Sequence, residues 1–193
     1  MTTRAKVHNT TIELVNSDIT KQDVDVIVNA ANSALAGGGG VDGAIHRAAG
    51  RDLMKELRER YRGGCPTGEA RITAGYNLPA KFVIHAVGPI YRNVDNPAEL
   101  LASAHSYSLK LAQENNAKTI AFPAISTGVY GYPMKEAATV ALSAVSAYIK
   151  KHQPDFELVR FVLYSANPLK NPMTIFSQAL ADLIDSDEVV QAL

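Results

Sequence analysis

Short runs of β-branched and apolar residues alternate along this chain with longer segments that repeat a hydrophobic residue every three or four positions. The short runs are typical of strands buried in a sheet, and the longer segments are typical of amphipathic helices. The pattern predicts strands at residues 11–15, 25–29, 69–73, 82–87, 119–122 and 159–164. It predicts helices at residues 42–49, 51–61, 97–114, 133–151 and 171–184.

Alternating strands and helices predict an α/β fold with a largely parallel sheet that helices cover on both faces. Pro97 and Pro133 are expected in the first turn of their helices, where a missing N–H costs no hydrogen bond. The sequence has no interdomain linker and no internal repeat. We therefore expect one domain over residues 1–193, with its core at about 11–184 and a tail at 185–193 that can fray.

Composition and charge exclude several classes of protein. Hydrophobic residues make up 47% of the chain, and 19 Lys and Arg balance 19 Asp and Glu. A neutral chain is not expected to bind nucleic acid through bulk charge. Cys65 is the single cysteine, so no internal disulfide forms, and neither a signal peptide nor a long apolar span is visible. These features favour a soluble protein of a reducing compartment, the cytoplasm, with no membrane partner.

Two glycine-rich loops each follow a predicted strand. The first contains four consecutive glycines at 37–40, and the second spans residues 123–133 with Gly128 and Gly131. Glycine has no Cβ, so successive backbone N–H groups can converge on an anion. Ligands of open α/β sheets bind at the carboxyl ends of strands. The two loops are therefore predicted to face one crevice and to hold a diphosphate between them.

Two other glycine-loop proteins fit the sequence poorly. Gly38, Gly40 and Gly43 satisfy the dinucleotide pattern G-x-G-x-x-G, but residues 29–36 separate the glycines from the preceding strand. The acid at the expected offset, Glu59, lies in a charged helical pattern rather than at the end of a strand. An NAD-dependent oxidoreductase is thus disfavoured. A Walker A loop is excluded because the chain contains no Gly-Lys pair.

Five ordered blocks of the sequence closely resemble the macrodomain family, and most closely its MacroD-type branch of ADP-ribosyl hydrolases. They are residues 17–20 (SDIT), 28–33 (VNAANS), 37–45 (GGGGVDGAI), 84–89 (IHAVGP) and 125–133 (ISTGVYGYP). The resemblance implies a three-layer α/β/α fold with a mixed sheet and an ADP-ribose cleft at its crest. It implies hydrolysis of the ester between ADP-ribose and protein Asp or Glu side chains, and of O-acetyl-ADP-ribose. The expected partners are therefore ADP-ribose, ADP-ribosylated proteins and O-acetyl-ADP-ribose.

The same resemblance implies roles for individual residues. Asp42 would be catalytic beside the anomeric carbon, and Asn32 would orient the distal ribose through a hydroxyl. Asp18 would accept a hydrogen bond from the adenine amino group, with the amide of Ile19 nearby. The remaining ligand-binding residues implied are Asn29, Ala31, Gly39, Gly40, Val41, Ser126, Thr127, Gly128, Val129 and Tyr130.

Each catalytic or adenine-binding candidate also has a purely structural interpretation. Asp42 begins a helical pattern and could be its N-cap, and Asn32 could be a turn residue. Asp18 could cap a turn. Ser17 stands where the family usually has glycine, so a positive φ there would strain it.

The histidines and the cysteine are interpreted as structural. His46 is expected to be a packed helix residue, although it could tune Asp42 four residues earlier, and His85 is expected to be a satisfied core residue. Cys65 has no evident partner base and is expected to be a bystander. With one cysteine and scattered histidines, neither a metal site nor a cofactor is expected.

Three functions remain compatible with this family. A hydrolase is favoured by Asp42 and Asn32, because a module that only binds needs no acid beside the anomeric carbon. The alternatives are a non-catalytic ADP-ribose reader and an ADP-ribose-1″-phosphate phosphatase. Whether Asp42 or a substrate phosphate activates the attacking water stays open.

Overall fold

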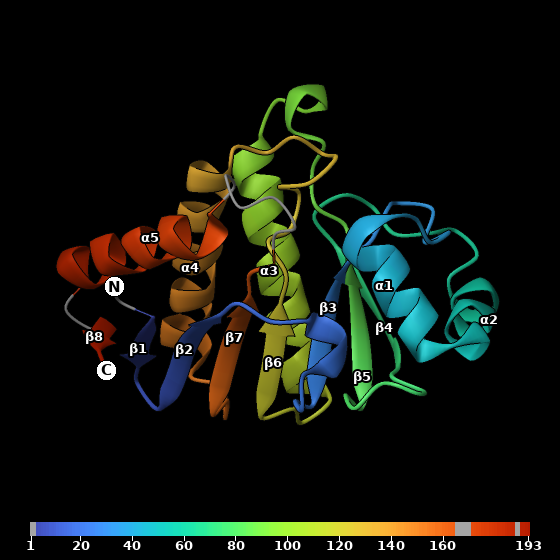
Figure 1. The fold of residues 1–193 in the computed structure, drawn as a ribbon, viewed down its shortest axis with the longest axis horizontal. Coiled ribbons are helices and arrows are strands. Elements are labelled where there is room, and N and C mark those ends of the chain that lie inside the picture. The colour runs from blue at the N-terminus through green and yellow to red at the C-terminus, as the bar shows by residue number, and fades with distance from the viewer. Residues whose placement is uncertain (1–2, 165–170, 188–189) are drawn as a thin grey trace.

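The computed structural model describes residues 3–164, 171–187 and 190–193 (Figure 1). These residues form one eight-stranded sheet with the order β4-β5-β3-β6-β7-β2-β1-β8. The strands are β1 (Arg4–Val7), β2 (Thr10–Val15), β3 (Val26–Ala30), β4 (Ala70–Ala74), β5 (Phe82–Ala86), β6 (Thr119–Phe122), β7 (Leu158–Val162) and β8 (Val190–Ala192). The five neighbours β5, β3, β6, β7 and β2 run parallel, while β4, β1 and β8 pair antiparallel.

The helices that cover the sheet are α1 (Gly40–Ala49), α2 (Arg51–Arg60), α3 (Pro97–Glu114), α4 (Met134–His152) and α5 (Pro172–Ser186). Two short 3₁₀ turns, η1 (Ile19–Lys21) and η2 (Tyr91–Asn93), complete the described elements. None of the helices in the described part of the chain has the length and apolarity that crossing a bilayer requires.

The α/β fold with a mixed, largely parallel sheet is confirmed, and every predicted strand and helix is present within two residues of its predicted ends. Pro97 occupies the first turn of α3 as expected. Pro133 does not occupy the first turn of α4, because it is the N-cap of that helix. The end of the chain also differs from expectation. Residues Val190–Ala192, predicted to lie in a frayed tail, form β8 and pair with β1.

Alternate residues of the central strands pack into two hydrophobic layers, one on each face of the sheet. Val28, Ile84 and Phe122 face the layer shared with α3, α4 and α5. Ile27 and Val83 face the smaller layer shared with α1 and α2. Figure 1 shows α1 and α2 together at the β4–β5 end of the sheet. Because side chains alternate along a strand, the polar residues at odd-numbered positions of β3 and β5 lie under α1.

A partly exposed ion pair and two backbone hydrogen bonds join the amino-terminal ends of three parallel strands. Asp25, directly before β3, accepts from Lys81 Nζ (2.7 Å) and from the backbone amides of Lys118 (2.8 Å) and Thr119 (3.1 Å). Burial favours the neutral acid, but these donors outweigh it and lower the pKa of Asp25 to about 2. One carboxylate thus ties the starts of β3, β5 and β6 together, at the edge opposite their carboxyl ends.

We expect Asp25→Asn to lower the free energy of unfolding by about 1–3 kcal/mol at pH 6, because an amide N–H then faces the backbone donors. The pKa of the Asp25 carboxyl is lower in the folded chain than its ordinary value of 3.8. Its stabilisation is therefore complete above that value and is lost as the pH falls through about 2. Urea unfolding at pH 6 and pH 3 should show a smaller wild-type advantage at pH 3. The exposed Asp23→Asn is the control, and an equal advantage at both pH values would contradict the assignment.

Candidate active site

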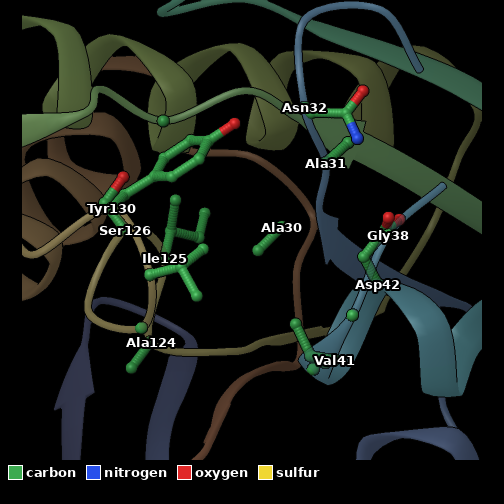
Figure 2. Close-up of a pocket in the computed structure, with 15 residues that line it drawn as sticks. Ala30, Ala31, Asn32, Gly38, Val41, Asp42, Ala124, Ile125, Ser126 and Tyr130 are labelled. Carbon is green, nitrogen blue, oxygen red and sulfur yellow. The ribbon is translucent and has the colours of Figure 1, made fainter. Parts of the chain in front are cut away.

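A pocket of about 300 Å³ lies where the chain leaves the carboxyl ends of β3, β5 and β6 (Figure 2). The predicted crevice is therefore present, and both glycine loops contribute to it. The residues that line it are Ala30, Ala31, Asn32, Gly38, Gly39, Gly40, Val41, Asp42, Gly88, Ala124, Ile125, Ser126, Gly128, Val129 and Tyr130.

Asn32 shapes the first glycine loop and also lines the pocket. Its Nδ2 donates to the Gly37 carbonyl (2.9 Å), and its Oδ1 accepts from the Ala36 amide (3.2 Å). Leu35 and Gly37 have φ values of 53° and 76°, so the loop reverses through left-handed residues. Asn32 is therefore a turn residue that also lines the pocket, where a contact with the ligand stays a prediction.

Asp42 is the third residue of α1 and not its N-cap. The N-cap is Gly39, which has no side chain to bond the first turn. Gly43 allows this turn to lie close to the glycine loop, because a Cβ there would stand 2.5 Å from the Gly38 carbonyl oxygen. The carboxylate of Asp42 turns inward, toward the sheet, and does not cap the first turn of its helix.

The Asp42 side chain is held almost completely out of solvent, with 6% of the residue exposed. Asn29 Nδ2 donates to its Oδ1 at 2.6 Å, and His46 Nε2 lies 3.3 Å from the same oxygen. The other oxygen, Oδ2, lies on the side of Gly38, where a Cβ would be 3.2 Å away. Since a buried charge needs a hydrogen bond, the Asn29 amide stabilises the carboxylate at the pocket wall, with the His46 ring beside it. His46 is therefore packed on α1 next to Asp42, as both of its interpretations from the sequence require.

Asn29 lies on β3 directly beside His85 on β5. Its Nδ2 is also 3.1 Å from His85 Nδ1, and His85 Nε2 is 3.0 Å from Thr73 Oγ1. Burial lowers the pKa of His85 to about 3, with a further contribution from His46, so the ring is neutral. His85 is confirmed as a satisfied core histidine, although the sequence did not indicate that it bonds to Asn29.

The opposite wall of the pocket is the loop after β6. Ser126 has a φ of 66°, an unusual backbone conformation for a residue with a side chain. Its carbonyl accepts from the Tyr132 amide (3.0 Å), which fixes the loop, but its buried Oγ has no hydrogen-bond partner in the part of the chain that the structure describes. Strain and an unpaired hydroxyl at one residue are typical of functional loops.

Tyr130 stands on this wall, and Figure 2 shows its ring across the pocket from Asp42. Burial and the negative charge of Asp42 raise the pKa of its hydroxyl. Val129, beside it, is 99% exposed on the rim. The pocket therefore has a carboxylate on one side and a neutral phenol on the other.

Four of the residues predicted to bind ligand do not line the pocket. Asn29 lies beneath Asp42, and Thr127 bonds the Ala124 carbonyl (2.8 Å) inside its own loop. Ile19 is buried in the layer under α1. Asp18 caps η1 by accepting from the Thr20 amide (2.9 Å) and hydroxyl (2.7 Å).

The bonds to Thr20 lower the pKa of Asp18 and occupy one of its oxygens. Ser17, next to it, is not among the non-glycine residues with positive φ in the described chain, so serine is unstrained there. Cys65 is 2% exposed in a small apolar cluster, and burial raises the pKa of its thiol to about 11. Its thiol therefore has no reactive character.

Five pocket residues were not predicted individually as ligand contacts, although Gly38 lies in the first predicted glycine loop; they are Ala30, Gly38, Gly88, Ala124 and Ile125. Gly88 had a signal, since it follows β5 at the same edge as both loops. A Cβ at Gly88 would lie 2.2 Å from Ser126 Oγ. The absence of a side chain at Gly88 therefore lets the segment after β5 pack against the loop after β6. Within the described residues, no group of three or more His, Cys, Asp or Glu could hold a metal ion.

The Macro domain family model matches residues 28–141 of this chain. A protein of Escherichia fergusonii named O-acetyl-ADP-ribose deacetylase is 55% identical over 156 residues, which are 79% of this chain and 88% of that protein. A Xenopus laevis protein named ADP-ribose glycohydrolase MACROD2 is 49% identical over 178 residues, which are 91% of this chain but only 41% of that protein.

Solved structures agree with the sequence comparisons. The Oceanobacillus iheyensis macrodomain with ADP superposes with a TM-score of 0.89 at 42% identity, over 97% of this chain and 98% of that one. The Trypanosoma brucei macrodomain in complex with ADP-ribose superposes with a TM-score of 0.79 at 37% identity, over 88% and 68%. The predicted resemblance is thus confirmed, and this chain belongs to the Macro domain family.

Proposed function

We propose that this chain binds ADP-ribose and hydrolyses the ester that joins it to Asp or Glu side chains of proteins, or to acetate in O-acetyl-ADP-ribose. The observation that carries the proposal is the buried Asp42 carboxylate, held at the wall of a pocket between two glycine loops. The names of the Escherichia and Xenopus relatives, a deacetylase and a glycohydrolase, support the same reaction class.

The two glycine loops suit a diphosphate. A Cβ at Gly39, Gly40 or Gly128 would meet no atom within 4 Å, so this space is left to the ligand. The first turn of α1, whose backbone N–H groups have no partner within the helix, begins at the pocket with Gly40. Backbone N–H groups and the positive end of the helix dipole together stabilise a bound phosphate. This explains how a chain of zero net charge binds an anion.

Asp42 and Asn32 supply what ester hydrolysis requires. Hydrolysis adds water across the ester and releases ADP-ribose with a free hydroxyl and a free carboxylate. The water must be positioned, and its proton needs an acceptor. Oδ2 of Asp42 is the oxygen that Asn29 leaves unbound, so we assign it to the water or to its proton. Asn32 cannot titrate, and its remaining amide hydrogen orients the distal ribose.

We place the reaction in the cytoplasm. The chain has a single cysteine, which is buried and free, so its fold suits a reducing compartment. Proteins that carry ADP-ribose on Asp or Glu are the proposed partners. Asp18 and Ile19 stay assigned to the adenine end of the ligand, beyond the pocket described above.

Asp42→Ala should reduce the release of ADP-ribose from a carboxyl-linked, ADP-ribosylated protein by about 10²-fold or more, because the water loses its acceptor. ADP-ribose affinity, measured by calorimetry, should change little, since the diphosphate contacts come from the loops. The exposed Asp52→Ala on α2 is the control and should keep full activity. Equal turnover in wild type and Asp42→Ala would contradict the catalytic assignment.

The same assay separates the other two functions. Binding of ADP-ribose without release from the modified protein would identify a reader. Release of phosphate from ADP-ribose-1″-phosphate without ester cleavage would identify a phosphatase.

Gly128→Glu should abolish ADP-ribose binding without unfolding the protein. The introduced side chain meets open space in the chain itself, and Gly128 has no positive φ, so folding tolerates it. The new carboxylate would stand where the diphosphate binds, and like charges repel there. Gly63→Glu, which also meets open space but lies away from the pocket, is the matched control. Unchanged ADP-ribose affinity in Gly128→Glu would refute the placement of the diphosphate.

A further inference from the structure

Three neighbouring strands carry a continuous row of buried polar side chains beneath Asp42. Thr73 on β4, His85 on β5 and Asn29 on β3 are each at most 1% exposed. Thr73 Oγ1 lies 3.0 Å from His85 Nε2, His85 Nδ1 lies 3.1 Å from Asn29 Nδ2, and Asn29 Nδ2 lies 2.6 Å from Asp42 Oδ1. The row runs from an outer strand of the sheet to the wall of the pocket.

The hydrogen bonds of this row can be assigned from its chemistry. An ionised Asp42 only accepts, so the Asn29 atom that faces it must be the donor Nδ2. The same nitrogen faces His85 Nδ1, which must therefore accept. A neutral imidazole has one donor and one acceptor, so His85 carries its proton on Nε2 and donates to Thr73 Oγ1. Reversing the Asn29 amide would bring its carbonyl oxygen against the carboxylate.

This orientation of the Asn29 amide lowers the stability of the fold, because it leaves one buried oxygen atom without a hydrogen bond in the described part of the chain. Asn29 Oδ1 is buried and has no hydrogen-bond partner among the described residues. An orphaned buried acceptor typically costs about 1–3 kcal/mol. A leucine or valine at this strand position would avoid that cost, as Ile27 and Val83 do on the same face. Both hydrogens of the Asn29 amide are instead used to fix the carboxylate and the ring.

We propose that Asn29 is a positioning residue that turns Oδ1 of Asp42 inward so that Oδ2 faces the pocket, and that His85 and Thr73 fix the direction of the Asn29 amide. The kinetic part of this proposal rests on the hydrolase function proposed above. The geometric part, the orientation of the Asp42 carboxylate, does not depend on it.

A position that matters only for packing would affect the enzyme differently. It would change the melting temperature, and any loss of activity would follow the loss of folded protein. A positioning residue lowers kcat while KM and ADP-ribose affinity are kept, because the ligand is bound by the loops. It also loses its effect once Asp42 is absent, since its only route to the reaction is through that carboxylate.

The test compares wild type, Asn29→Ala, Asp42→Ala and the double variant, each as the full chain. Asn29→Ala should lower kcat about 10-fold or more, with KM and ADP-ribose affinity within about 2-fold, because a small displacement of a reacting group is costly. In the Asp42→Ala background the same substitution should have no further effect. A crystal structure of Asn29→Ala should show the carboxylate rotated. Unchanged kcat, or equal effects in both backgrounds, would overturn the proposal.

Thr73→Val is a second, isosteric variant, remote from the ligand, in case Asn29→Ala does not fold. In wild type, ¹⁵N NMR should show His85 protonated on Nε2 throughout pH 5–8. Loss of the Thr73 acceptor should shift the ring toward the Nδ1–H form, which no longer accepts from Asn29. The fall in kcat should be smaller than in Asn29→Ala. An unchanged tautomer in Thr73→Val, or an Nδ1–H ring in wild type, would overturn the role of His85.

A failure of the proposed function would look different from a failure of this inference. If wild-type protein releases no ADP-ribose, the hydrolase assignment fails. The His85 tautomer and the crystallographic orientation of Asp42 would still decide whether Asn29 positions the carboxylate. If wild type is active but Asn29→Ala leaves the carboxylate unmoved, only the positioning role fails.

Discussion

The Asp42 carboxylate is almost fully buried at the wall of the pocket. Its need for a hydrogen-bond donor constrains the residues on the strands beneath it. A donor must reach it from the sheet, and Asn29 does so from the end of β3. The donor must point correctly, which the neutral ring of His85 on β5 ensures. Because the partners sit on adjacent parallel strands, the register of β3 and β5 is part of the site. The sheet therefore acts as more than a support for the loops.

The two edges of the parallel strands differ in how well their polar groups are hydrogen-bonded. At the amino-terminal edge, Asp25 accepts hydrogen bonds from Lys81, just before β5, and from the amides of Lys118 and Thr119 at the start of β6. At the carboxyl edge, Asn29 Oδ1 and Ser126 Oγ are buried with no partner among residues 3–164, 171–187 and 190–193, and Ser126 has a left-handed backbone. Unsatisfied groups and local strain persist only where the surrounding fold is stable enough to hold them.

Much of the fold could be read from the sequence, because hydrophobic periodicity reports directly which segments are strands and helices. The pairing of β1 with β8 could not, since it joins the two ends of the chain through three or four residues each. Such short strands have no strong pattern, and their stability comes from partners distant in sequence. The predicted start of α4 was wrong by one residue for a different reason, because a proline is compatible with both the N-cap and the first turn of a helix.

The sequence by itself determined the order of elements, the two glycine loops and their convergence at the carboxyl ends of neighbouring parallel strands. It also placed an acid just after the first loop. Only the tertiary structure decided that Asp42 turns away from its own helix terminus to accept from Asn29, and that His85, 56 residues away from Asn29 in the chain, orients that amide. Periodicity tells which face of a strand is buried. It does not tell which helix packs over that face, and the chemistry of a buried polar residue depends on that neighbour.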